Sequence, residues 1–340
     1  MAQVQLVQDF KLIREQVNNT RHQRAPVSGG NFEQRFSKDL PTFGIIIAAG
    51  KALRLGNVYV SLSVLRRHIS SKLPVEIWHV GSDELDAASR AYFEAQFAPL
   101  RCIDAETVPQ PAHHRPPASL NGYALKIFAL YATTLDRVLG LDSDCMITIN
   151  PLNLFTSPPF REHGNLFWPD LFRKGLEMVS GVSPKLYGLF GLRLPWEGQE
   201  QAFMWAESGQ FLIDRSRHWD VIEYLWLLNT HADPTHKLAY GDKDTFLLAF
   251  LLAGKGESYY QVGEWARLCV HQLPQRPGAK LEHVGLLHHA PDATIAFLHR
   301  TAGGKLDPLV DTVKTVDFVT PPLHPLWLSH PARRQAFSCA

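Results

Sequence analysis

Cysteine is scarce in this sequence and widely spaced. The four cysteines among 340 residues are Cys102, Cys145, Cys269 and Cys339, and no two form a Cys-x-x-Cys pair. A zinc knot needs closely spaced thiolates, and a disulfide framework needs a much higher cysteine density. Both are excluded as organising features, and the cysteine usage is typical of a protein in a reducing compartment.

A long apolar run is also missing. The most apolar stretches, 43–50 and 245–254, have the length of buried strands or core helices, and no run reaches 18 residues. The N-terminus lacks the charged region followed by an apolar one that marks a signal peptide. The chain as given is therefore expected to have no transmembrane segment and to be cytoplasmic or otherwise soluble.

The sequence has no excess of charge of either sign. Its 34 basic and 33 acidic side chains give a formal net charge of +1. A nucleic-acid-binding surface over much of the protein would need a clear basic excess, so this class of partner is not expected. The balance still leaves room for a local basic pocket that binds a diphosphate.

Strands and helices alternate in the first half of the chain, which predicts an α/β fold around a parallel sheet. After Asn150 the pattern changes, and the frequent proline, tryptophan and glycine residues through Glu200 predict a loop-rich region. We predict a partly helical lead-in segment over 1–40, one α/β domain over 41–318 with halves 41–150 and 151–318, and a proline-rich tail over 319–340. The elements expected are strands at 43–50, 75–80, 100–103, 137–141 and 211–213, and helices at 4–18, 58–69, 84–97, 125–134, 220–229 and 244–252.

The central motif is Leu141-Asp-Ser-Asp-Cys145, which follows a buried strand. In an extended segment residues i and i+2 point to the same side, so Asp142 and Asp144 are expected to share one target. The carboxyl end of a parallel strand is where open α/β sheets bind ligands. Two carboxylates there suit Mg²⁺ or Mn²⁺, which would bridge the protein to a nucleotide diphosphate. A bare Asp-x-Asp is also common as a solvated turn or cap.

A candidate third metal ligand is His299, in the stretch Phe297-Leu-His-Arg-Thr-Ala-Gly-Gly-Lys305. An imidazole is acceptable to Mn²⁺. The glycines after it would let the backbone approach a phosphate, and Lys305 could add a positive charge. With sixteen histidines in the chain, the alternative of a surface turn with a capping histidine stays open.

Several segments together resemble the fungal Mnn-type α-mannosyltransferases of glycosyltransferase family 71. No single segment is specific, but they follow one another in the family's order over about residues 43–305. The segments that carry the resemblance are Gly44-Ile-Ile-Ile-Ala-Ala-Gly50, Leu65-Arg-Arg67, Leu73-Pro-Val-Glu-Ile-Trp78, Tyr123-Ala-Leu-Lys126 with Ile127-Phe-Ala129, Leu141-Asp-Ser-Asp144, Asn150-Pro-Leu-Asn-Leu-Phe155, Phe167-Trp-Pro-Asp170, Glu207-Ser-Gly-Gln210, Gly241-Asp-Lys-Asp-Thr-Phe246 and His299-Arg300 with Lys305.

The resemblance implies a GT-A fold, a Rossmann-like and mainly parallel sheet with flanking helices in a single catalytic domain. It also implies a retaining transfer of a hexose, mannose above all, from a nucleotide sugar (GDP-mannose or a UDP-sugar) to a hydroxyl acceptor such as a glycan, with Mn²⁺ or Mg²⁺. Residues 41–150 would then be the nucleotide-sugar half and 151–318 the acceptor half. Of the two retaining routes, fold analogy favours attack by the acceptor from the leaving-group face over a covalent intermediate on Glu207 or Asp242.

Site residues follow from the matching positions of the family. Those implied to hold the metal are Asp142, Asp144 and His299; those implied to bind the donor are Asp142, Lys126, Gly50 and Lys305; those implied to face the donor sugar and acceptor are Glu207, Gln210, Asp242 and Asp244. Each has a plain structural alternative. Asp242 could only cap the helix after it, Glu207–Gln210 could only form a turn, and Lys126 could be a solvated residue on a helix face.

The sequence departs from the family in two motif positions and in its N-terminus. Cys145 stands where the family usually has Asn, and Asn150 where it usually has Asp. Fungal members carry a membrane anchor and act in the Golgi, so a Golgi-lumenal location is expected only if an anchor was removed. These differences leave the donor sugar, the acceptor and the compartment open.

Three other functional hypotheses compete with that of a transferase. The run Ala48–Gly56 resembles the triphosphate loop of sugar-1-phosphate nucleotidyltransferases, but Ala52 replaces a glycine that the loop needs. A haloacid-dehalogenase phosphatase would have Thr where Met146 stands. A non-catalytic carbohydrate-binding protein on a transferase fold would be expected to have lost its acidic pairs, which this chain retains.

Overall fold

The computed structural model describes most of the chain from the N-terminal helix to the last strand. The described residues are 2–22, 42–49, 55–120, 122–170, 183–195, 197, 205–239, 241–271 and 282–300. The predicted proline-rich tail over 319–340 lies outside them. The division of the chain into a lead-in segment, two halves and a tail stays a prediction.

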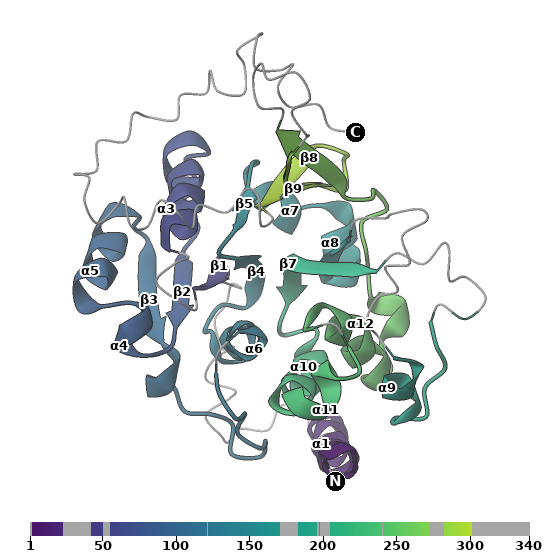
Figure 1. Ribbon diagram of the computed structural model, residues 1–340. Coiled ribbons are helices and arrows are strands. Elements are labelled where there is room, and N and C mark those ends of the chain that lie inside the picture. Colours follow the sequence, from purple (N-terminus) through teal and green to yellow (C-terminus); the bar gives the residue numbers. More distant parts are fainter. Residues whose placement is uncertain are drawn as a thin grey trace.

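A six-stranded sheet forms the centre of the molecule, in the order β3-β2-β1-β4-β7-β6 (Figure 1). Its strands are β1 (Phe43–Ala48), β2 (Val75–His79), β3 (Leu100–Asp104), β4 (Arg137–Asp142), β6 (Asn165–Pro169) and β7 (Ala206–Asp214). The first four pair in parallel, β7 runs antiparallel to β4, and β6 runs antiparallel to β7. Since two reversals restore the direction, only β7 opposes the others in this sheet.

The sheet is buried on both faces, as expected for a mainly parallel sheet. Alternate residues of a strand point to opposite faces, so β1 sends Ile46 into one apolar cluster and Ile45 and Ile47 into another. Val138 and Leu139 divide in the same way on β4. This explains why β1 and β4 are continuous apolar runs rather than alternating ones.

Helices cover both faces of the sheet (Figure 1). On one face α6 packs against β1 and β2, α10 packs on α6 and α12, and α1 packs on α10. The helices are α1 (Ala2–His22), α3 (Leu55–Ser63) with a π-helical turn (Val64–His68), α4 (Gly81–Glu84), α5 (Ala87–Gln96), α6 (Tyr123–Ala132), α7 (Leu152–Phe155), α8 (Pro158–His163), α9 (Pro184–Gly188), α10 (Trp219–Thr230), α11 (Ala232–His236) and α12 (Lys243–Leu252), with 3₁₀ turns at Ala105–Thr107 and Gly256–Ser258. The predicted GT-A-type architecture is confirmed: a mainly parallel sheet flanked by helices in a single domain.

A second, antiparallel sheet was not predicted. Its order is β5-β10-β9-β8, with β5 (Cys145–Ile147), β8 (Arg267–His271), β9 (Glu282–His289) and β10 (Ile295–Arg300). The prediction of a loop-rich region over 150–200 was also incomplete, because this region supplies β6 of the central sheet. The second sheet brings the end of β10 next to the end of β4, and this positions the site.

The N-terminal helix α1 is longer than the predicted 4–18 and packs against the core of the domain. Its buried residues Leu6, Phe10, Ile13 and Val17 belong to the same apolar cluster as α6 and α10. The spacing of three or four residues places them on one face of the helix. No helix in the described part of the chain is long and apolar enough to cross a membrane.

Candidate active site

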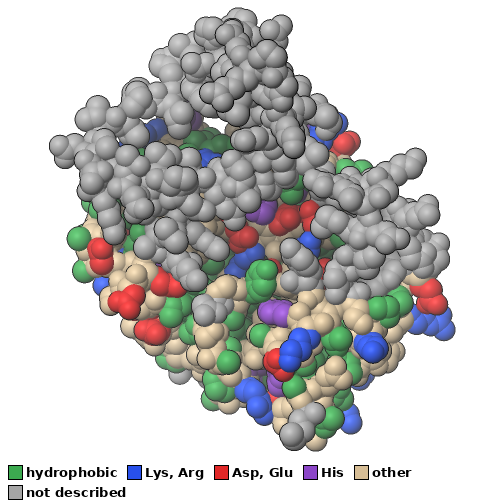
Figure 2. Space-filling view, in the orientation of Figure 1, with side chains coloured by type: hydrophobic (Ala, Val, Ile, Leu, Met, Phe, Trp, Pro, Cys, Tyr) green, Lys and Arg blue, Asp and Glu red, His purple; other side chains and the backbone are tan. Residues whose placement is uncertain are grey.

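Acidic side chains gather at one edge of the central sheet. β4 ends at Asp142, and Asp170 directly follows β6, so both lie at carboxyl ends of strands that run the same way. The reversed strand β7 begins at this edge, which brings Glu207 and Ser208 there as well. This is the edge at which open α/β sheets bind ligands. Side chains of both charges and a histidine gather near the middle of this face in Figure 2.

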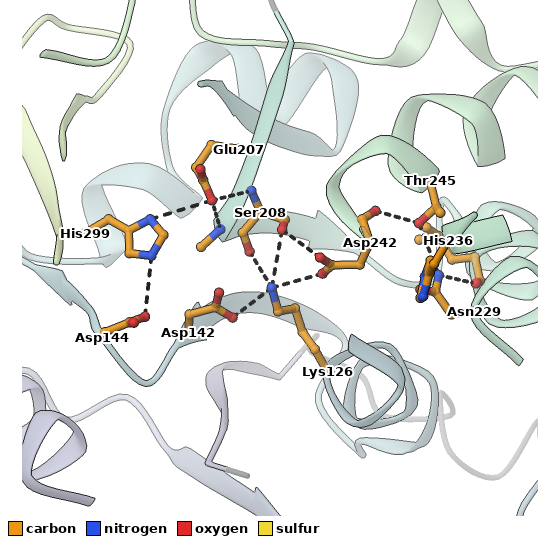
Figure 3. Close-up of polar contacts among 12 residues, drawn as sticks. Lys126, Asp142, Asp144, Glu207, Ser208, Asn229, His236, Asp242, Thr245 and His299 are labelled. Atoms are coloured by element: carbon orange, nitrogen blue, oxygen red, sulfur yellow. Dashed lines mark hydrogen bonds and ion pairs between the residues drawn. The ribbon is translucent and has the colours of Figure 1, made fainter. Parts of the chain in front are cut away.

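Lys126 is a buried cation between two carboxylates (Figure 3). Its Nζ lies 2.7 Å from Asp142 Oδ1 and 2.9 Å from Asp242 Oδ2, and it donates a 2.9 Å hydrogen bond to the Ser208 carbonyl. The residue is 6% exposed, so the alternative hypothesis that Lys126 is a solvated residue on a helix face is wrong. Burial alone would lower the pKa of Lys126, but the two carboxylates outweigh it and raise the pKa, so the side chain is protonated.

Asp242 contributes to this cluster rather than capping α12. It occupies the position before the helix, but its side chain makes no capping hydrogen bond. Instead Asp242 Oδ1 accepts a 3.0 Å hydrogen bond from Ser208 Oγ, and the residue is 2% exposed. The alternative that Asp242 is only a helix cap is therefore wrong.

Asp142, Asp144 and His299 converge, although not by the expected route. Ser143 and Asp144 form a turn between β4 and β5 instead of continuing an extended strand. His299 reaches them because β10 pairs with β5, with His299 opposite Cys145. Its Nε2 lies 3.4 Å from Asp144 Oδ1. One ligand atom from each of Asp142, Asp144 and His299 lies within 4.8 Å of the others.

The donor set fits a divalent cation. In this cluster four carboxylates, those of Asp142, Asp144, Glu207 and Asp242, face two cationic side chains. Burial and the neighbouring acidic groups raise the pKa of Asp142, which means that its negative charge is poorly compensated. Oxygen ligands with one imidazole are acceptable to Mn²⁺, and carboxylates suit Mg²⁺. The predicted ligands are therefore placed where a bound cation would relieve the charge imbalance.

His299 is held as a cation by its acidic neighbours. Burial would lower its pKa, but the hydrogen bond with Asp144 and the charges of Glu207 and Asp142 raise it to about 9. The protonated ring balances part of the acidic charge. A metal ion that binds Nε2 must replace this proton, since only the neutral imidazole is a ligand.

Glu207 lies behind His299, on the side away from Asp144 (Figure 3). Its Oε1 is 3.6 Å from His299 Nδ1 and accepts hydrogen bonds from the backbone N–H groups of Ser208 (2.9 Å) and Gly209 (2.8 Å). It belongs to β7, so the alternative of an isolated turn over 207–210 is wrong. Gly209 leaves room for the ring, because a Cβ there would lie 2.6 Å from His299 Cε1 and Nδ1.

Two predicted residues lie apart from this cluster. Gln210 is fully buried in β7, and its Oε1 accepts from the Cys145 thiol at 3.2 Å. Asp244 lies in the first turn of α12, two residues after Asp242, and lines a small pocket. Residues two apart on a helix do not share a face, which explains why the Asp242 and Asp244 pair is divided.

The pocket beside Asp244 contains residues to which the sequence assigned no role. It is lined by Tyr187, Trp205, Ala206, Lys243, Asp244, Leu247, Tyr259 and Gln261. Lys243 pairs with Asp170 at 2.6 Å and connects the pocket to the strand end beside Glu207.

Asp170 could have been found from the sequence because it directly follows a buried strand, as Asp142 does. Ser208 gave no such signal. Gly50 and Lys305, both predicted donor-binding residues, lie outside the described residues.

Comparisons with known proteins give a family match over most of the chain. The family model described as "Mannosyltransferase putative" matches residues 42–188 and 198–289. Among curated proteins, the chain is 27% identical over 302 residues to Alpha-1,2-mannosyltransferase MNN22 of Candida albicans, covering 76% of this chain and 49% of that protein. It is 28% identical over 265 residues to MNN23 of the same yeast, covering 64% and 41%. The chain thus spans about half the length of the curated relatives it matches, or less.

Solved structures of related shape include glycosyltransferases. The galactosyltransferase LgtC, in complex with donor and acceptor sugar analogues, is 18% identical with a TM-score of 0.39, covering 60% of this chain and 69% of that one. The bifunctional glycosyltransferase WbbM is 15% identical with a TM-score of 0.44, covering 63% and 38%. At these values the structures resemble the chain in fold only.

Proposed function

The chain belongs to the mannosyltransferase family whose model it matches, and we propose that it is a metal-dependent retaining glycosyltransferase that moves a hexose from a nucleotide sugar to a hydroxyl acceptor. The observation that carries this proposal is the convergence of Asp142, Asp144 and His299 beside the buried Lys126 at the ligand-binding edge of the sheet. Carboxylates and an imidazole hold a cation there, and both the cation and the lysine attract a diphosphate.

Each charged group then has a place in donor binding. Asp142, Asp144 and His299 hold the divalent ion, which supplies positive charge to the diphosphate leaving group. Lys126 holds Asp142 and Asp242 in position and adds a second positive charge near the donor. Ser208 fixes Asp242 by donating a hydrogen bond from its hydroxyl to Oδ1, which leaves Oδ2 paired with Lys126. Preorganised charges of this kind stabilise the transition state without rearranging during the reaction.

The retaining step is best explained by a reaction in which no protein side chain acts as nucleophile. The acceptor oxygen attacks the anomeric carbon from the face that the diphosphate leaves. The bond from that carbon to the phosphate oxygen breaks, and the departing phosphate takes the acceptor's proton. Glu207 accepts two backbone N–H groups and faces His299, which favours a positioning role for Glu207 over nucleophilic attack.

Glu207 acts through His299 in this proposal. Metal-binding histidines commonly direct their second ring nitrogen to a carboxylate, which fixes the ring and raises its basicity. Replacing Glu207 by Gln is therefore expected to weaken Mn²⁺ binding about 10- to 100-fold. If Glu207 were instead the nucleophile, Glu207→Gln would bind Mn²⁺ like the wild type and lose only turnover. Mass spectrometry of a glycosyl adduct on Glu207 would also contradict the positioning role.

The donor and acceptor follow from the relatives. Those relatives are named alpha-1,2-mannosyltransferases, so we favour GDP-mannose as donor and a mannose-containing glycan as acceptor, with a UDP-sugar as the alternative donor. The acceptor is expected to enter from the side of Asp244, where the partly buried Trp205 lines the pocket, since aromatic rings pack well on sugar faces. Gln210 stays a candidate for a supporting role: it is buried in β7 near the proposed donor site and accepts a hydrogen bond from Cys145.

The proposal is tested by thermal shift and by donor hydrolysis with GDP-mannose, UDP-glucose, UDP-galactose and UDP-N-acetylglucosamine, each with Mn²⁺, Mg²⁺ or EDTA. A ligand that binds only the folded state at about 100 times its Kd adds about 2.7 kcal/mol of stability. One donor is expected to stabilise the protein only with metal, and Asp144→Asn to abolish this, while Asp83→Asn on the exposed face of α4 has no effect. Stabilisation by a nucleoside triphosphate alone would favour the nucleotidyltransferase instead. Metal-dependent donor binding without any turnover would favour a carbohydrate-binding protein.

A further inference from the structure

Two consecutive histidines in the segment between β3 and α6 reach one carboxylate on α10. His113 Nε2 lies 3.0 Å and His114 Nε2 2.6 Å from the same atom, Glu223 Oε2. In an extended chain the side chains of neighbouring residues point to opposite sides. Here a turn at 112–113 bends the backbone so that both rings point to Glu223. One hydrogen bond would tether the segment to α10, so the convergence of both rings calls for another explanation.

Two imidazoles and a carboxylate are a common ligand set for zinc. One ligand atom from each of His113, His114 and Glu223 lies within 4.8 Å of the others. We propose that these three residues bind a zinc-type divalent cation at a site separate from the one at the end of β4. The site lies on α10 and the segment before α6, away from the second sheet that carries His299 (Figure 1). It does not rest on the proposed transferase function.

The carboxylate of Glu223 is held in place from behind. Tyr131 on α6 donates a 3.0 Å hydrogen bond to Glu223 Oε1, which leaves Oε2 directed at the two rings. Metal-binding carboxylates are typically oriented by such an outer hydrogen bond. The glutamate also stands on the second turn of the buried helix α10, so a ligand is presented by a rigid element.

The ligand distances suit a cation after a small adjustment. Zinc bonds of about 2.0–2.2 Å with tetrahedral angles separate a nitrogen and an oxygen ligand by about 3.3–3.5 Å. The two observed N···O distances are shorter, so each ring has to move outward by roughly 0.3–0.9 Å, which side-chain rotations of the loop histidines can supply. The side chain of His114 is 1% exposed, whereas that of His113 is 35% exposed. The His113 side gives the ion a path from solvent and leaves room for a water as fourth ligand.

The site would link a segment with little regular structure to the core helix α10. The segment with the histidines contains four prolines, Pro109, Pro111, Pro116 and Pro117, and its described residues 108–120 form no helix or strand. The same segment leads into α6, which carries Lys126. A cation held by this segment and α10 would therefore stabilise the helix that holds the donor-site lysine, without touching the donor.

The test uses the full chain with Asp144→Asn and His299→Ala, so that the first site does not compete. The metal-free protein is titrated with ZnCl₂ by calorimetry and with CoCl₂ by visible absorption, because tetrahedral Co²⁺ has a characteristic spectrum. His113→Gln is the main variant, since this ring is partly exposed and its loss spares the core. Glu223→Gln keeps the shape of the side chain and an oxygen for Tyr131. His68→Gln, at an exposed histidine, is the matched control.

The expected result is one equivalent of Zn²⁺, with a Kd that rises at least about tenfold in His113→Gln and in Glu223→Gln and is unchanged in His68→Gln. Mg²⁺ should not compete at millimolar concentration, because it rarely takes imidazole ligands. The proposal is overturned if the metal-free protein binds no Zn²⁺, or if His113→Gln binds it as tightly as the background variant. Either result would make the two histidines a hydrogen-bonded tether of the segment. Should Glu223→Gln fail to fold, the His113→Gln comparison alone decides.

Discussion

Replacing Gly209 by alanine is the sharpest single test of the site, because it changes the position of His299 without changing a charge. A Cβ at Gly209 would lie 2.6 Å from two atoms of the His299 ring, while ordinary contacts begin at 3.4 Å. The ring therefore has to move by about 0.8 Å, the difference of the two distances. Bonds between a metal and nitrogen tolerate only about 0.2 Å of change. We therefore expect His299 to bind the metal ion much more weakly.

We expect Gly209→Ala to weaken metal binding strongly and to change the stability of the fold only a little. Disturbing the support of a metal ligand typically weakens metal affinity about 10- to 100-fold, or about 1.4–2.8 kcal/mol. Gly209 lies in a strand and its φ is outside the left-handed region, so alanine fits the backbone and even restricts the unfolded chain. The melting temperature without metal should therefore stay close to that of the wild type.

The assay is titration of Mn²⁺ by calorimetry, with melting curves in EDTA measured on the same samples. Gly188→Ala, at the end of α9, is the control, since a Cβ there meets nothing within 4 Å. Unchanged Mn²⁺ affinity in Gly209→Ala would refute the reasoning, because it would mean that His299 is no ligand. A collapse of the melting temperature in EDTA would refute it differently, by showing that the ring is packed as core.

Two further predictions concern buried charge and pH. Lys126→Met should cost about 3–5 kcal/mol in urea unfolding, because it leaves Asp142 and Asp242 buried without their cation, and adding Asp242→Asn should recover part of the loss. His218 donates from Nε2 to the carbonyl of His163, and burial lowers its pKa to about 4, below the ordinary 6.5. A lowered histidine pKa means that the unfolded chain binds the proton first, so this contribution to stability is complete above pH 6.5 and is lost as the pH falls toward 4. Between pH 7.5 and 5 His218 should contribute about 2 kcal/mol to the loss of stability, so the loss in His218→Gln should be smaller than in the wild type by that amount, whereas an equal pH dependence in wild type and variant would contradict it.

The sequence was sufficient for those parts of the fold that depend on local pattern. The runs at β1 and β4 are continuously apolar, and this feature alone indicates strands buried on both faces. The helices α6, α10 and α12 carry enough apolar residues to be placed within about two residues of their observed ends. These elements already set the ligand-binding edge, so the position of Asp142 followed from the pattern.

The remainder depends on contacts between distant segments. β5 has three residues and is a strand only because β10, about 150 residues later, pairs with it. No local signal marks a strand of that length, so the turn at Ser143 and Asp144 was taken for extended chain. For the same reason the sequence could suggest His299 only as a candidate ligand and could not place it beside Asp144. Ser208 shows no pattern at all, since its importance lies in its contacts with Lys126 and Asp242.

The placement of Lys126 explains how the cluster can exist before a metal or a donor arrives. Removing a lysine from water is costly, and one carboxylate rarely compensates it fully. Here two carboxylates and a carbonyl compensate Lys126: Asp142 at the end of β4, Asp242 directly before α12, and the Ser208 carbonyl in β7. Lys126, a cation that belongs to the chain, therefore holds β4, α12 and β7 together. Asp144 and Glu207 instead meet His299, whose charge depends on a proton that a metal can replace. Lys126, the permanent cation, therefore stabilises the fold in addition to its proposed role at the donor, and His299, the exchangeable cation, marks the place where a metal ion can bind.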